Sequence, residues 1–217
     1  MLTFRFDSQP GSRLVVLALG SHADDIEIGC GGTILRLLRG HSDVEVHWIV
    51  LSGGRERAEE ARASAESFLE RASQRRILVE NFRDGFFPYE GAPVKEFFEK
   101  LKGEVAPDVI FTHQRHDLHQ DHRLVSDLTW NTFRDHLILE YEIPKFDGDF
   151  GTPNFFVHLD EETCDTKVAR LMTHFGTQLE RHWFTADVFR SLLRLRGMEA
   201  GSPSGHAEAF YCRKVAF

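Results

Sequence analysis

The chain has few cysteines and no long apolar stretch. Its three cysteines, Cys30, Cys164 and Cys212, lie far apart and form no CxxC pair. An odd, scattered set of this kind argues against a disulfide scaffold and is typical of a reducing compartment, so we expect a cytoplasmic protein. No apolar run approaches the roughly 18 residues that span a bilayer, and the run at residues 14–19 is too short for a signal-peptide core. We therefore expect no membrane span.

Basic residues are also in deficit. The chain has 26 Lys and Arg against 34 Asp and Glu, a formal net charge of -8. Such a chain repels phosphate backbones and anionic membranes unless a basic patch intervenes, and the arginines of residues 71–76 fit better as the end of a charged helix. We therefore expect no nucleic-acid partner.

Phosphate-binding signatures are incomplete. Gly29 and Gly31 lie between an expected strand and an expected helix, as in a dinucleotide-binding loop, but Ile34 occupies the third glycine position. The GxxxxGK[ST] pattern is absent as well. A nucleotide-binding oxidoreductase is therefore disfavoured.

The chain does have a normal share of core-forming residues, with 41% hydrophobic and 12% aromatic residues among 217. This length and composition predict one globular domain over residues 1–217. Aliphatic segments alternate with amphipathic ones through the first half, which is typical of βαβ units. We predict a Rossmann-like α/β fold, a parallel sheet with helices on both faces.

The expected elements are as follows. Strands are predicted at residues 13–20, 44–51, 77–79, 108–112, 137–143, 155–159 and 207–215, and helices at residues 32–39, 56–71, 94–102, 122–134, 161–175 and 185–196.

Histidine is over-represented, with 12 residues, and two segments concentrate it with aspartate. Residues 21–25, SHADD, directly follow the first expected strand, and residues 113–122, HQRHDLHQDH, follow the strand at 108–112. Ligands of open α/β sheets bind at the carboxyl ends of the strands, so both segments lie where a site is expected.

These residue types suit a catalytic zinc, which takes three ligands from His, Asp or Glu and leaves one position open. His22 and Asp25 are close enough in sequence to share an ion, and a histidine of the second segment completes the set. Asp24 then remains as a base, and His119 with Asp121 can meet charge on a carbonyl oxygen. The spacing alone does not choose the third ligand, and a simpler interpretation of both segments is a helix cap and a solvated loop.

At this point the sequence resembles the LmbE-like (PIG-L) family of zinc-dependent de-N-acetylases. Residues 21–32, SHADDIEIGCGG, are similar to its N-terminal HPDD motif, and residues 119–122, HQDH, to its HPDH motif. Three further segments resemble family motifs, namely RAEEA at 57–61, FGTQ at 175–178 and GHAEAF at 205–210. Ala23 and Gln120 replace the prolines of the two main motifs, and this leaves every ligand and acid–base group in place.

The resemblance implies a role for each site residue. The metal ligands are then His22, Asp25 and His122, bound to Zn²⁺ or to another divalent ion such as Fe²⁺. Asp24 becomes the general base, His119 the group that stabilises the oxyanion, and Asp121 the partner that orients His119. Arg57 lies near the substrate. These roles agree with those assigned above from the residue types, which by themselves could not choose His122 over His116 or His119 as the third ligand.

The expected function is therefore hydrolysis of an N-acetylated amino sugar of the N-acetylglucosamine type, giving a free amine and acetate. The alternative is a carbohydrate-binding or regulatory module that keeps the fold without turnover. The resemblance, together with aromatic residues at 82–89 and 146–156, also predicts a possible homo-oligomer.

Overall fold

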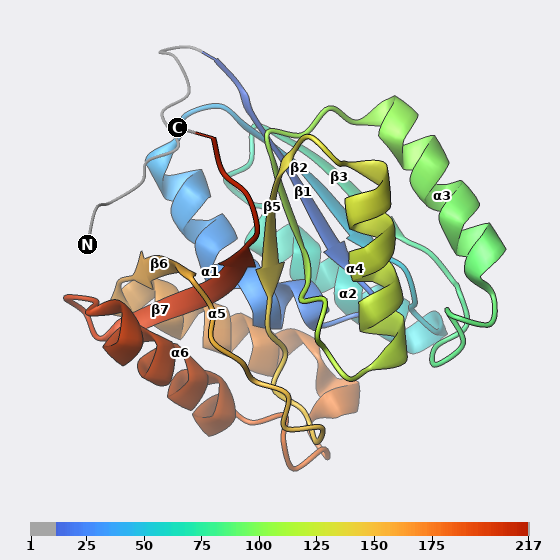
Figure 1. Ribbon diagram of the computed structural model, residues 1–217. Helices are drawn as coiled ribbons and strands as arrows, with labels where there is room; N and C mark the ends of the chain where they lie inside the picture. Colours follow the sequence, from blue (N-terminus) through green and yellow to red (C-terminus); the bar gives the residue numbers. More distant parts are fainter. Residues whose placement is uncertain (1–11, 217) are drawn as a thin grey trace.

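Seven strands form one sheet in the order β3-β2-β1-β4-β5-β7-β6 in the computed structural model, which describes residues 12–216 (Figure 1). The strands are β1 Leu14–Gly20, β2 Val44–Val50, β3 Gln74–Val79, β4 Val109–His113, β5 Leu137–Tyr141, β6 Phe155–Leu159 and β7 His206–Cys212. The helices are α1 Asp25–Gly40, α2 Arg55–Phe68, α3 Gly91–Glu104, α4 Gln120–Thr132, α5 Glu161–His174 and α6 Ala186–Ala200, with a short 3-10 helix η1 Gly176–Gln178. The sheet joins all the described strands; residues 1–11 and 217 of the expected domain lie outside the described part.

The α/β fold expected from the sequence is confirmed, with one correction at the edge of the sheet. The first five strands pair in parallel, whereas β7 runs antiparallel to both β5 and β6. The sheet is therefore mixed rather than wholly parallel. Side chains alternate between the two faces of a strand whichever way it runs, so the pattern at residues 207–215 indicated a strand without its direction.

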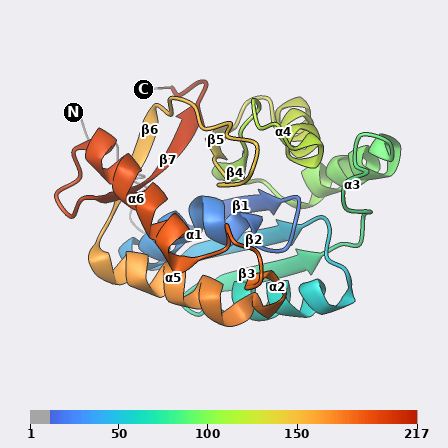
Figure 2. The same ribbon diagram turned by 90° about the horizontal axis from the view of Figure 1, so that it is seen from below.

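Helices cover both faces of this sheet, as predicted (Figure 2). Alternate residues of β1 enter different cores: Val16 and Ala18 pack with residues of α1, α2, α5 and α6, while Leu17 and Leu19 pack with residues of α3 and α4. A strand that is apolar on both faces stays buried only between two helical layers, which explains its unbroken aliphatic sequence. None of the described helices is both long enough and apolar enough to cross a membrane.

Helix α1 begins at Asp25, seven residues before its expected start at Gly32. The glycines that looked like a turn are contact points inside this helix. A Cβ atom on Gly29 would lie 2.2 Å from Cδ2 of Tyr141, and one on Gly31 would lie 2.7 Å from Cε1 of Phe68. The glycines thus let α1 approach the sheet and α2 closely.

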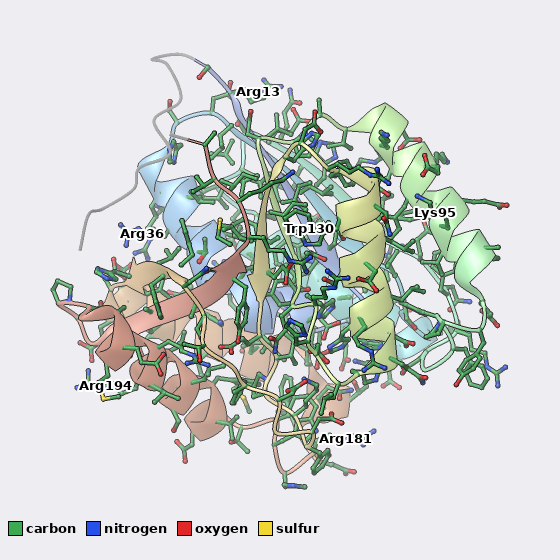
Figure 3. All side chains as sticks on the ribbon, viewed as in Figure 1. Arg13, Arg36, Lys95, Trp130, Arg181 and Arg194 are labelled. Carbon is green, nitrogen blue, oxygen red and sulfur yellow. The ribbon has the colours of Figure 1, made fainter. Side chains whose placement is uncertain are left out.

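The two ends of the sheet differ in character. Arg13, labelled in Figure 3, lies at the amino end of β1 and pairs with Asp43 at 3.2 Å. The histidine-rich segments lie at the opposite, carboxyl ends of β1 and β4. These two parallel neighbours flank the point where the strand order reverses, since the chain continues from β1 to β2 on one side and from β4 to β5 on the other. Ligand sites of open α/β sheets form at such a point.

Candidate active site

The two histidine-rich segments meet at the carboxyl ends of β1 and β4. His22 follows β1 directly, Asp25 begins α1, and His122 lies in the first turn of α4. The Asp25 carboxylate accepts a hydrogen bond from the backbone N–H of His22 at 2.6 Å, which holds the turn between β1 and α1 closed. The three side chains predicted from the family resemblance to hold a metal are therefore brought together from two segments about a hundred residues apart.

We call His22, Asp25 and His122 the inner set. His22 Nδ1 lies 3.1 Å from His122 Nε2 and 3.4 Å from Asp25 Oδ2, and His122 Nε2 lies 3.6 Å from Asp25 Oδ1. A tetrahedral ion with ligand bonds of about 2.0–2.1 Å separates its donors by roughly 3.3 Å. All three residues are buried. The donor types and their separations thus fit a divalent cation of the zinc or iron class.

The ring of His122 is oriented for this role by a carboxylate behind it. Its Nδ1 lies 3.0 Å from Asp117 Oδ2, which also accepts a hydrogen bond from Lys145 at 3.0 Å. Burial, followed by the charge of the neighbouring His113, lowers the pKa of His122 to about 3. The ring is therefore neutral, and with Nδ1 donating to Asp117 its Nε2 lone pair points at the inner set, the arrangement typical of metal-binding histidines.

His113 is a fourth imidazole at this edge, and the sequence analysis treated it only as a strand end. Its ring stacks on that of His122 with centroids 3.9 Å apart, and its Nε2 lies 3.2 Å from Asp25 Oδ2. One ligand atom each from Asp25, His113 and His122 lies within 4.8 Å of the others. His116, which spacing also left open, is exposed. The signal that could have identified His113 was its position at the carboxyl end of β4.

Asp24 lies beside the inner set with a different environment. Arg57 Nη2 donates to its Oδ1 at 3.2 Å, while Oδ2 is buried and has no hydrogen-bond partner among the described residues. Burial raises the pKa of Asp24 to about 6, with Arg57 opposing the shift and the Asp25 charge adding to it. A carboxylate of this pKa can both accept and return a proton near neutral pH.

His119 caps the start of α4. The backbone N–H of Asp121 donates to His119 Nδ1 at 3.3 Å. Burial, followed by the charge of His22, lowers the pKa of His119. A neutral ring that accepts at Nδ1 carries its proton on Nε2, so His119 can offer an N–H to a reacting oxygen.

The Asp121 carboxylate faces His22 rather than serving the His119 ring. It accepts hydrogen bonds from the backbone N–H groups of Gly85 at 2.7 Å and Phe87 at 3.1 Å, and its Oδ2 lies 3.3 Å from His22 Nε2. The pairing of Asp121 with His119 expected from the family resemblance is thus a backbone contact, and the side chain orients a predicted metal ligand instead.

Two further charged residues near the site, Asp84 and Lys145, had no clear sequence signal. Asp84, in the loop after β3, lies 3.1 Å from His22 Nε2 and 3.8 Å from Arg57. Lys145 comes from the turn-rich segment after β5. Two of the segments that resemble family motifs, residues 57–61 and 175–178, contact each other. Glu60 of α2 accepts hydrogen bonds from the backbone N–H and the hydroxyl of Thr177, at 2.8 and 2.6 Å.

The sequence is similar to those of known proteins. The family model described as PIG-L, GlcNAc-PI de-N-acetylase, matches residues 17–133. YaiS of Escherichia coli K12, named as an uncharacterised deacetylase, is 28% identical over 180 residues, which cover 77% of this chain and 94% of the relative.

Two solved structures share the fold. N,N'-diacetylchitobiose deacetylase from Pyrococcus horikoshii is 20% identical with a TM-score of 0.68, covering 91% of this chain and 83% of that one. GalB, the 4-carboxy-2-hydroxymuconate hydratase from Pseudomonas putida, is 15% identical with a TM-score of 0.66, covering 94% and 98%. Because one neighbour is a deacetylase and the other a hydratase, the fold alone does not determine the reaction.

Proposed function

Because this chain belongs to the PIG-L family of de-N-acetylases, we propose that it is a metal-dependent hydrolase that removes the acetyl group from an N-acetylated amino sugar. The observation that carries the proposal is a buried carboxylate, Asp24, with one unpartnered oxygen beside the inner set. A general base placed next to a cluster of metal-competent donors is the arrangement that amide hydrolysis requires.

A divalent cation held by His22, Asp25 and His122, zinc or iron among the candidates, would act as a Lewis acid on the acetyl carbonyl. Asp24 takes a proton from water as the water oxygen attacks the acetyl carbon. His119 donates its Nε2–H to the carbonyl oxygen that gains negative charge. As the C–N bond breaks, Asp24 returns its proton to the leaving nitrogen, so one amide and one water give one amine and one acetate.

Arg57 has two functions in this proposal. Its guanidinium contacts Asp24 at 3.2 Å, which limits the rise in that carboxyl's pKa, and it extends toward Asp84 on the accessible side of the site. A guanidinium in this position can donate to sugar hydroxyls. We infer that Arg57 contacts an N-acetylglucosamine-type ring, as the family resemblance implies.

Acetate release tests this proposal. The metal-loaded protein is incubated with a panel of N-acetylated sugars, free, nucleotide-linked and lipid-linked, and both acetate and new primary amine are measured. We expect equal amounts of the two products from at least one sugar, and a loss of both in Asp24→Asn.

The alternative, a binding module without turnover, has a distinct outcome in the same experiment. Sugar binding detected by calorimetry without acetate release from any member of the panel would favour that module and contradict the hydrolase.

A further inference from the structure

A second group of atoms that could bind a metal lies near Nε2 of His22, on the side of the ring away from Asp25 and His122. Nδ1 of His22 faces the inner set, whereas Nε2 lies 3.1 Å from Asp84 Oδ1 and 3.3 Å from Asp121 Oδ2. His119 lies between the two sides: one of its ligand atoms lies within 4.8 Å of one each from His22, Asp84 and Asp121, and it makes a similar group with His22 and His122. We call Asp84, His119 and Asp121 the outer set.

The two carboxylates of the outer set share one side-chain donor, Nε2 of His22. One N–H cannot donate fully to both. The guanidinium of Arg57 lies 3.8 Å from Asp84 Oδ2 and also contacts Asp24 at 3.2 Å. Two like charges drawn to one donor repel each other, and a cation between them removes that repulsion.

We propose that Asp84, His119 and Asp121 form a second site for a divalent transition-metal cation such as Zn²⁺, adjacent to the inner set. One imidazole and two carboxylates are ligand types that Zn²⁺ accepts. A neutral His119 ring offers the ion its one nitrogen lone pair. The His22 ring lies between the two sites, and its Nε2–H donates to the carboxylates of the outer set.

Exposure sets the order in which the two sites fill. The Asp84 side chain is 58% exposed, whereas those of His22 and Asp25 are 10% and 4% exposed. An exposed carboxylate loses favourable hydration when it binds a metal, so its net binding free energy is smaller. A dication already bound in the inner set also repels a second one. The outer site is therefore the weaker one and fills only at higher metal concentration.

Occupation of the outer site has a consequence for turnover. It takes His119, which the proposed function uses to stabilise the oxyanion, and it draws Asp84 away from Arg57. Excess zinc is therefore expected to lower the rate. That consequence rests on the proposed function, but the site itself is tested by counting ions, which needs no substrate.

The test is a zinc titration of chelator-treated, full-length protein, with bound ions counted by equilibrium dialysis and metal analysis. We expect two ions per chain in two resolved steps for the wild type, and one ion for Asp84→Asn. Asp147→Asn is the matched control: it removes the same charge from an exposed loop residue and should retain both ions. Thermal unfolding confirms that each variant is folded.

Anomalous diffraction from zinc-soaked wild-type crystals provides a measurement that needs no variant, with a second peak expected between Asp84 and His119. One ion per chain at saturating zinc overturns the proposal, as does a second ion that Asp84→Asn retains or a second peak elsewhere. If the ion count is two but no N-acetylated sugar is hydrolysed, the proposed function fails while the outer site stands.

Discussion

Asp24 and Asp25 are adjacent and chemically alike, yet their surroundings separate them. Three histidines surround Asp25 and hold its pKa well below the ordinary value against the effect of burial, with His122 and His113 contributing most. Asp24 is instead buried beside one guanidinium, and its pKa is raised to about 6. A permanently charged carboxylate suits a metal, and one that titrates near neutral pH suits proton transfer.

This difference predicts a two-by-two pattern. Asp25→Asn and His122→Ala should lose bound metal, because each removes a donor of the inner set. Asp24→Asn and His119→Ala should keep the inner metal and lower kcat by on the order of 10²–10⁴-fold, the usual effect of removing an acid–base group. Metal content and kcat are measured for all four. Loss of metal in Asp24→Asn with retention in Asp25→Asn would reverse the two roles.

Lys145 offers a second prediction, through Asp117. Its ammonium lies 3.0 Å from the Asp117 oxygen that holds His122 and contacts Asp149 as well, with a side chain only 9% exposed. Lys145→Met should leave His122 less firmly oriented and weaken zinc binding by up to ~10-fold, the lower range for partners of metal ligands.

A chelator competition measures this affinity. Lys100→Met, at a lysine whose side chain is 75% exposed on α3, is the control and should bind zinc as the wild type does. If the two variants bind zinc with equal affinity, Lys145 stabilises only its own loop and does not affect the orientation of His122.

The sequence indicated the two segments that carry the inner set because each segment begins where a strand ends, and the structure brings the three side chains together. Their role as metal ligands stays a prediction. The choice of His122 over His116 needed the family resemblance, since both lie in one polar segment. Lys145 and Asp84 escaped prediction because each lies in a loop whose path depends on the tertiary fold. The partners of Asp121 escaped for the same reason: its carboxylate accepts from backbone N–H groups of the neighbouring loop, while the His119 ring contacts only its backbone N–H.

At the scale of elements, α1 is tied to the end of the sheet by an ion pair beneath it. Lys167 of α5 and Glu208 of β7 lie 2.6 Å apart and are both buried. Lys167 donates to the carbonyl of Ile28 at 2.6 Å, and Glu208 accepts from the N–H of Gly32 at 2.8 Å. In a regular α-helix the N–H of residue 32 donates to the carbonyl of residue 28. The ion pair therefore contacts both backbone groups of one such hydrogen-bond position in α1.

Gly29 tests how closely α1 is packed. Gly29→Ala should destabilise the fold by about 1–3 kcal/mol, the usual effect of overpacking, because the new methyl group meets the ring of Tyr141. Gly40→Ala in the same helix is the control, since no side chain or backbone from elsewhere in the fold lies within 4 Å of a Cβ there. Urea unfolding of both variants gives the comparison, and equal stabilities would show that Tyr141 moves aside.

Element prediction succeeded where side-chain period decides the structure and failed where packing does. The strands at β1, β2 and β4 have the unbroken aliphatic runs of a doubly covered sheet and were placed within a residue or two. The start of α1 was misjudged because glycine disfavours an isolated helix, whereas here its missing side chain permits contact. No local pattern distinguishes those two uses.

At the scale of the whole molecule, the Lys167–Glu208 pair joins α5, α1 and β7. Lys167→Met should lower the free energy of unfolding by about 3–5 kcal/mol, because the Glu208 carboxylate is then buried without its cation. The double variant Lys167→Met/Glu208→Gln should recover a substantial part of that loss. Chemical denaturation of the set measures both effects, and a double variant no more stable than the single one would contradict this account.

Self-association is the remaining prediction. Several large apolar side chains are exposed in the loops after β3 and β5, including Tyr89 at 75% and Phe146 at 69%. Exposed apolar surface is a common feature of interaction sites, and together with the family resemblance it leads us to expect a homo-oligomer. Light scattering at micromolar concentration measures its mass, and Tyr89→Ser/Phe146→Ser should shift it toward the monomer. A wild-type monomer at that concentration would reject the prediction.

The antiparallel strand has a consequence for synthesis on the ribosome. Among the described strands, β6 pairs only with β7, and β7 follows every other strand along the chain. The parallel strands β1 to β5 are all available once residue 141 has emerged, whereas β6 waits until residue 212 has left the exit tunnel. Until then α1 also lacks the Glu208 contact beneath it. Translation therefore delivers the predicted metal-binding segments early and the strand that secures them last.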